Sequence, residues 1–199
     1  MSLWFYRFAQ GVVRLVLTVG NRFSVIDAHN VPAEGPAIVA CNHVSYLDPP
    51  ALGCALPRPM AYMAKIELFA IPVLGPVIRA LGAFPVDRSR GDVAAIKQAA
   101  AVLRTGALLA MFPEGTRNVD GSAKPQFGVA LLASMTGAPV VPAYLSGTSQ
   151  ANRLAKVTVI YGEPVRFEPG RKARREDLAK WTGDLMERIG ALREKIVAN

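Results

Sequence analysis

The sequence predicts an α/β fold with a mostly parallel central sheet that is covered by helices on both faces. Two observations lead to this class. Short apolar runs alternate with helical patterns along the chain, and within each run the apolar residues are nearly continuous rather than alternating. Strands of that composition are buried on both faces, as they are in parallel sheets.

The predicted elements follow one another in a regular order. Six apolar runs are predicted as strands: residues 23–26, 37–41, 60–64, 107–112, 140–145 and 157–161. Four stretches with helical periodicity separate or follow them: residues 49–56, 93–104, 129–135 and 177–197. The last helix carries apolar side chains at spacings of three and four, which indicates a packing face, so we assign it no chemistry. No linker, repeat or low-complexity tract divides the chain, and one domain is expected over residues 23–199.

Residues 1–22 are predicted to be an N-terminal amphipathic segment that associates with a membrane. Four polar residues recur at spacings of three or four and would form one narrow stripe on an otherwise apolar helix: Arg7, Gln10, Arg14 and Thr18. A membrane-spanning helix needs about 20 predominantly apolar residues with few charges. A helix in the membrane interface, with Trp4, Phe5 and Phe8 in the acyl boundary, fits better. The alternative is a helix that packs on its own domain.

A second apolar stretch covers residues 68–84. Pro72, Gly75 and Pro76 break it and Arg79 interrupts it, so it cannot form a continuous spanning helix. It is expected to form either part of the domain core or a second membrane-facing surface beside the active site.

The composition is both basic and apolar. The net charge is +8 and 51% of the residues are hydrophobic, and the mean hydropathy is positive. This combination indicates an anionic membrane surface as a partner. Nucleic acid is not expected, because few aromatic residues are interleaved with the basic ones and no recognition module is present. The basic cluster at residues 171–175 is either a solvated helix start or a surface that attracts anionic headgroups or an acidic acyl carrier protein.

Cys41 and Cys54 are the only cysteines. Two cysteines are too few for a disulfide scaffold, and neither has metal-ligand spacing, so a reduced, cytosol-facing location is expected. Cys41 precedes His43 by two residues and is therefore a candidate nucleophile. The favoured interpretation is that Cys41 is a small buried apolar residue at the end of a strand.

His43 and Asp48 form the main candidate site. They lie in residues 42–49 (Asn-His-Val-Ser-Tyr-Leu-Asp-Pro), directly after a predicted strand. A carboxylate bonded to one ring nitrogen fixes the tautomer of a histidine, so that the other nitrogen can take a proton from a hydroxyl group. We also predict that Asp48 is the N-cap of the next helix. The alternative is that Asp48 only caps the helix and His43 is a loop histidine. His29 precedes a turn and is treated as structural.

Three further segments follow the His43 segment along the chain. They are residues 82–88 (Gly-Ala-Phe-Pro-Val-Asp-Arg), 112–117 (Phe-Pro-Glu-Gly-Thr-Arg) and 138–142 (Ala-Pro-Val-Val-Pro). In this order, the four segments resemble the glycerolipid acyltransferase superfamily over roughly residues 36–145, and most closely its bacterial lysophosphatidic acid acyltransferases. One basic residue differs from the family pattern: Lys124 is shifted relative to the stretch that many relatives carry, and we assign it no role.

The resemblance implies roles for five residues that would bind the substrate. Gly115 would allow a close backbone approach or a positive φ, Thr116 would offer a hydroxyl, and Arg117 would offer a fork of donors suited to phosphate. Arg88 would supply a second cation, and Glu114 would hydrogen-bond the acceptor hydroxyl. Without the resemblance, Arg88 reads as one partner of a surface ion pair and Glu114 as the partner of Arg117.

The implied reaction moves a fatty acyl group from acyl-CoA or acyl carrier protein to the sn-2 hydroxyl of lysophosphatidic acid, giving phosphatidic acid. His43 would act as general base and Asp48 would orient it, with no cofactor and no metal. The enzyme would sit on the cytoplasmic face of the cell membrane, peripherally or monotopically. Three alternatives remain open: an acyltransferase for another lyso-lipid, a lipid or thioester hydrolase, and a noncatalytic lipid-binding protein.

Overall fold

The computed structural model describes residues 2–86, 92–168 and 173–197. In these residues, seven strands form one sheet in the order β1-β7-β6-β2-β5-β3-β4. The strands are β1 (Ser24–Ile26), β2 (Ala37–Cys41), β3 (Met60–Lys65), β4 (Ala83–Val86), β5 (Leu108–Met111), β6 (Val140–Ser146) and β7 (Thr158–Tyr161). All neighbouring pairs are parallel except β6 and β7. The predicted mostly parallel α/β fold is therefore confirmed.

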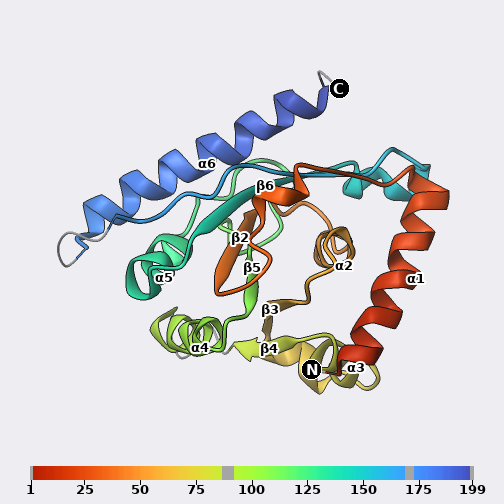
Figure 1. Cartoon of the computed structure of the whole chain (residues 1–199), viewed down its shortest axis with the longest axis horizontal. Coiled ribbons are helices and arrows are strands. Elements are labelled where there is room, and N and C mark those ends of the chain that lie inside the picture. The colour runs from red at the N-terminus through yellow and green to blue at the C-terminus, as the bar shows by residue number, and fades with distance from the viewer. Residues whose placement is uncertain (1, 87–91, 169–172, 198–199) are drawn as a thin grey trace.

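Helices cover both faces of the sheet (Figure 1). They are α1 (Leu3–Asn21), α2 (Asp48–Ala55), α3 (Leu74–Ala80), α4 (Asp92–Arg104), α5 (Gly128–Thr136) and α6 (Arg175–Val197). Short 3₁₀ turns lie at Ala28–Asn30, Ile66–Ala70 and Thr148–Arg153. Helices α4, α5 and α6 lie on one face, while α1 and α2 lie on the other.

The central strand β2 shows why its sequence is apolar throughout. All five of its residues are buried. Val39 and Cys41 belong to the apolar cluster under α1 and α2, whereas Ile38 and Ala40 belong to the cluster under α4, α5 and α6. Successive side chains point to opposite faces of a strand, so a strand between two helical layers needs apolar residues at every position.

The broken apolar stretch 68–84 contains elements that were not predicted. It begins within the 3₁₀ turn, continues as α3 and ends in β4, which is the edge strand next to β3. Helix α3 has only seven residues and includes Pro76, so its periodicity is too short to recognise in the sequence. Ile71 (44%) and Val73 (77%) before this helix are exposed, as is its first residue, Leu74 (39%).

Helix α1 packs on its own domain through its polar side, as in the alternative considered for this segment. Gln10 and Arg14 donate hydrogen bonds to backbone carbonyls of α2 and of the residue that follows it, and Leu17 is buried on the same domain. The apolar side faces outward instead. Its exposed residues are Leu3, Trp4, Phe8, Val12, Leu15, Val16 and Val19. Among the helices of the described residues, none combines the length and the apolar composition that crossing a bilayer requires.

Candidate active site

His43 and Asp48 form a hydrogen-bonded pair beyond the carboxyl end of β2. His43 Nδ1 lies 2.8 Å from Asp48 Oδ2. The Asp48 side chain is fully buried, whereas the His43 side chain is 17% exposed. Because Nδ1 is bonded to the carboxylate, Nε2 is the ring nitrogen left to exchange a proton with a substrate. This is the geometry of a general base held by an orienting carboxylate.

Asp48 also organises the backbone of the loop that carries His43. Its Oδ2 accepts hydrogen bonds from Val44 N and Ser45 N, both at 2.7 Å. The predicted N-cap role is wrong, because Leu47 is the N-cap of α2, no side chain caps that terminus, and Asp48 is the first residue of the helix. The carboxylate bonds amides upstream of the helix rather than those of its first turn. Its charge is used to fold the loop and to hold the histidine.

Phe112 supports the imidazole from one face. The two ring centroids are 4.2 Å apart and the rings are inclined by 22°, which is a stacked arrangement. Phe112 directly follows β5, and β5 pairs with β2 in parallel register, so both rings emerge from the same edge of the sheet. With Asp48 fixing Nδ1 and Phe112 fixing the ring plane, the imidazole is held in one orientation.

The loop after β5 lies beside the His43 loop at the same edge of the sheet. Gly115 adopts φ +67°, which confirms the predicted positive φ and explains the glycine. Its amide donates to Phe112 O at 2.9 Å and so closes the turn. Three residues later, Asn118 N donates to His43 O at 2.7 Å. The second motif is thereby bonded to the backbone of the proposed base.

Glu114 is buried beside the His43–Asp48 pair, and one of its carboxylate oxygens has no hydrogen-bond partner in the described residues. Its side chain is only 6% exposed, and Oε2 has no hydrogen-bond partner in the described residues. Burial raises the pKa of the Glu114 carboxyl above its ordinary value, while hydrogen bonds from its own backbone and from Asn118 and the charge of His43 act in the opposite direction. An unsatisfied buried oxygen is costly unless a ligand completes it. Glu114 is therefore suited to receive a hydroxyl donor.

Arg117 contacts Tyr46 rather than Glu114. Its guanidinium carbon lies 3.6 Å from the centre of the Tyr46 ring, and Nη2 donates to the Tyr46 hydroxyl at 2.8 Å. The alternative ion pair between Glu114 and Arg117 does not occur among the described residues. Both Arg117 and Tyr46 are exposed, which leaves most guanidinium donors free for an anion. Thr116 is exposed next to them. Arg88 lies outside the described residues.

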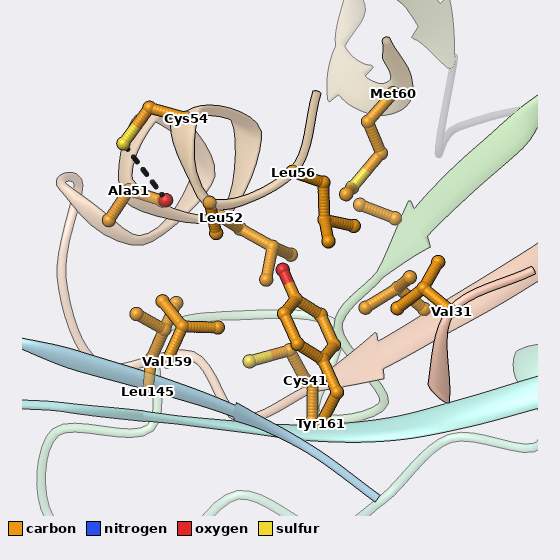
Figure 2. Close-up of a cluster of buried hydrophobic side chains, with 14 of the residues drawn as sticks. Val31, Cys41, Ala51, Leu52, Cys54, Leu56, Met60, Leu145, Val159 and Tyr161 are labelled. Carbon is orange, nitrogen blue, oxygen red and sulfur yellow. Dashed lines mark hydrogen bonds between the residues drawn. The ribbon is translucent and has the colours of Figure 1, made fainter. Parts of the chain in front are cut away.

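Cys41 has the environment of a core residue rather than of a nucleophile. It is fully buried and packs with Tyr161, Leu145 and Leu52 between the sheet and α2 (Figure 2). Burial raises the pKa of the Cys41 thiol well above its ordinary value, and the nearby charges of Asp48 and Glu114 raise it further. A thiolate is the reactive form, so this environment disfavours nucleophilic attack by Cys41.

Some residues of the site were not predicted. Asn42 Nδ2 donates to Leu145 O at 3.0 Å, and Leu145 N donates to Asn42 Oδ1 at 2.7 Å, so the side chain ties the start of the His43 loop to β6. Tyr46, Phe112 and Asn118 were also missed. All four lie within or beside the two motifs, but their contacts join distant parts of the chain. Across the described residues, no group of three or more His, Cys, Asp or Glu side chains is arranged to hold a metal ion.

The geometry agrees with comparisons to known proteins. Residues 22–146 match the family called Acyltransferase. The chain belongs to this acyltransferase family. The match includes both motifs that meet at the sheet edge, and it confirms the resemblance found in the sequence. It covers the sheet from β1 to β6 and ends before α6.

Individual acyltransferases are similar over most of the chain. A 1-acyl-sn-glycerol-3-phosphate acyltransferase of Bacillus subtilis (strain 168) is 32% identical over 196 residues, which cover 96% of this chain and 98% of that protein. The human 1-acyl-sn-glycerol-3-phosphate acyltransferase beta is 31% identical over 134 residues, 65% of this chain and 48% of that protein. The crystal structure of the 1-acyl-sn-glycerophosphate acyltransferase PlsC from Thermotoga maritima superposes with a TM-score of 0.68 at 29% identity, covering 93% of this chain and 81% of that one.

Proposed function

We propose that this acyltransferase moves a fatty acyl group from an acyl thioester of CoA or acyl carrier protein to the sn-2 hydroxyl of 1-acylglycerol-3-phosphate, giving phosphatidic acid. The observation that carries the proposal is the His43–Asp48 pair, 2.8 Å apart, at the same sheet edge as the loop from Glu114 to Arg117. The names of the relatives support the acceptor.

The chemistry follows from the orientation of His43. Its Nε2 takes the proton of the sn-2 hydroxyl while the oxygen attacks the thioester carbonyl. Asp48 stabilises the imidazolium that forms. The tetrahedral intermediate collapses with loss of the thiolate, which receives the proton from His43, so an ester forms, a free thiol leaves and His43 is neutral again. Backbone amides near the site stabilise the oxyanion. No enzyme-bound acyl group is needed.

The acceptor phosphate would bind at the exposed end of the site. Arg117 presents donors that Tyr46 does not use, with its guanidinium already held over the ring. Pre-orienting a long side chain lowers the entropy lost on binding. Arg88 would add a second positive charge. Glu114, whose Oε2 is unpartnered, would accept a hydrogen bond from a hydroxyl of the glycerol.

The outward apolar side of α1 would place this site at a bilayer. Trp4 is 76% exposed, Phe8 is 59% exposed, and their rings stack 6.0 Å apart. Ile71, Val73 and Leu74 add a second exposed apolar segment. The net charge of +8 favours a membrane that contains anionic lipid. We expect peripheral or monotopic association with the cytoplasmic face of the cell membrane, where both the acceptor and the product keep their acyl chains in the bilayer.

A product assay tests the proposed reaction. The purified protein is incubated with a panel of lyso-lipids, each with acyl-CoA and with acyl carrier protein as donor, and the products are resolved by mass. Phosphatidic acid formed from lysophosphatidic acid is the expected result. His43→Ala should lower kcat by about 10²-fold or more. His29→Ala is the matched control, because His29 is the other histidine and is exposed away from the site.

Each other outcome points to a different function. Free fatty acid released without an acceptor would identify a hydrolase. Acylation of a different lyso-lipid in preference would identify another acceptor. A folded His43→Ala protein with undiminished turnover would overturn the general-base mechanism, and binding of lipid with no product from any pair would leave a lipid-binding protein.

A further inference from the structure

Helix α2 carries Asp48 but is poorly suited to stand alone. It runs for eight residues, Asp48–Ala55, and contains two prolines and a glycine. Helices much shorter than about 12 residues are marginal in water, and the last carbonyls of any helix lack partners within it. Because Asp48 is the first residue of α2, its position depends on what holds the other end of this helix.

The polar side of α1 holds that end. Its side chains donate to carbonyls of the last turn of α2 and of the residue after it: Gln10 Nε2 to Gly53 O at 2.9 Å and to Leu56 O at 2.5 Å, Arg14 Nη1 to Cys54 O at 3.1 Å, and Tyr6 OH to Gly53 O at 3.3 Å. These are bonds between parts of the chain more than 35 residues apart. Arg14 also places a positive charge at the negative end of the α2 dipole, opposite the Asp48 carboxylate at the positive end.

A helix that served only to contact a membrane would turn its polar residues to water. In α1 two members of the polar stripe, Gln10 and Arg14, are instead bonded to the helix that begins with Asp48. We propose that Gln10 and Arg14 are positioning residues for catalysis: they fix the carboxyl end of α2, so that Asp48 at its amino end holds His43 in the orientation for proton transfer. This inference rests on the proposed acyl transfer.

The first test separates turnover from substrate binding. Gln10→Leu, Arg14→Leu and the double variant are assayed with 1-oleoyl-lysophosphatidic acid in detergent micelles, using the better of the two acyl thioesters. We expect kcat of the double variant to fall by about 10-fold or more, since small displacements of catalytic groups cost factors of up to about 10². KM should change little. Arg14→Lys, which keeps the charge and a donor, should restore most of kcat.

Arg7→Leu is the matched control. It removes the same charge from the same helix, but the Arg7 side chain is exposed and makes none of the bonds to α2. Its kcat should equal that of the unmodified protein. If Arg7→Leu lowers kcat as much as Arg14→Leu, the effect comes from the charge of α1 and the positioning role is wrong.

The second readout does not need catalysis. In protein labelled with ¹⁵N-histidine, the Nδ1 proton that His43 shares with Asp48 gives a hydrogen-bonded NMR signal, which His29→Ala helps to assign because the chain has two histidines. This signal should weaken or disappear in Gln10→Leu and Arg14→Leu and persist in Arg7→Leu. Lower thermal stability with unchanged kcat and an unchanged signal would overturn the inference. If the unmodified protein shows no acyl transfer at all, the proposed function fails, while the NMR comparison still decides whether α1 positions the pair.

Discussion

The most informative single perturbation is Asp48→Asn, because it removes a charge with little change of shape. The Asp48 Oδ2 accepts bonds from His43 Nδ1, Val44 N and Ser45 N, whereas the buried Oδ1 has no partner in the described residues. An asparagine whose oxygen replaces Oδ2 can keep all three bonds. Its NH₂ group then occupies the position of Oδ1, so one unpartnered buried atom replaces another. An amide oxygen is a weaker acceptor than a carboxylate, so the variant should fold with a lower melting temperature.

The effect on turnover follows from the distance in the pair. At an effective dielectric constant of about 20, two unit charges 2.8 Å apart attract by about 6 kcal/mol. The imidazolium charge is shared between two ring nitrogens, so about half of this, about 3 kcal/mol, stabilises the state in which His43 has taken the proton. Loss of that attraction corresponds to a fall in kcat of about 10²-fold. KM for lysophosphatidic acid should stay close to that of the unmodified enzyme.

The assay is steady-state turnover with both substrates saturating, at a temperature well below the melting temperature of each variant. Asp120→Asn is the control, since Asp120 is an exposed carboxylate bonded to Ser122 in the loop that follows the Glu114 motif. It should keep kcat within about twofold, as is usual for exposed charges. The reasoning is refuted if folded Asp48→Asn retains kcat within about threefold of the unmodified enzyme, because the carboxylate would then contribute almost no stabilisation to the protonated base.

Three further outcomes are expected. Arg117→Ala should raise KM for lysophosphatidic acid by about 10-fold or more with little effect on kcat, as for loss of a hydrogen bond to a charged group; an unchanged KM would remove Arg117 from the phosphate site. Because burial raises the pKa of Glu114 above its ordinary 4.5, the folded protein loses stability as pH rises from there through the raised value. The melting temperature of Glu114→Gln relative to that of the unmodified protein should therefore rise as the pH is raised above about 4.5, and a constant difference would contradict this. Trp4→Ser with Phe8→Ser should reduce sedimentation with anionic vesicles, whereas Met135→Ser, which changes an exposed residue on the opposite face of the sheet, should not; equal sedimentation would exclude α1 as the contact.

Most of the sheet could be predicted because its strands are buried on both faces. Continuous apolar runs such as residues 37–41 and 140–145 have few other stable environments, and the six predicted strands all occur. The edge strand β4 was missed because it is not buried in this way. Three of its four residues are only partly buried, and Pro85 lies within it, so its sequence lacks the signature of a central strand.

The pairing of His43 with Asp48 could also be foreseen, because the two residues are close in the chain. The contacts that complete the site could not be foreseen. Phe112 reaches His43, and Asn118 reaches its carbonyl, only because β2 and β5 are neighbours in the sheet although about 70 residues separate them. The contact between the polar side of α1 and the domain could not be predicted either, because an amphipathic pattern shows that a helix has two sides but not which side meets protein. Tertiary hydrogen bonds from Gln10 and Arg14 decide that question.

Each of the two carboxylates of the site has one buried oxygen without a partner in the described residues, and their other contacts separate their roles. Asp48 has one oxygen saturated by three donors, so its charge is held in place before substrate arrives. For Glu114, burial raises the pKa of the carboxyl, so a ligand hydroxyl or a proton at its unpartnered oxygen would complete its bonding. Carboxylates whose surroundings differ in this way commonly divide the tasks of a site. A charge fixed in advance suits the support of a base that becomes positive during the reaction. An acceptor left open suits recognition of a hydroxyl, so we propose that Glu114 meets the substrate, while Asp48 holds His43.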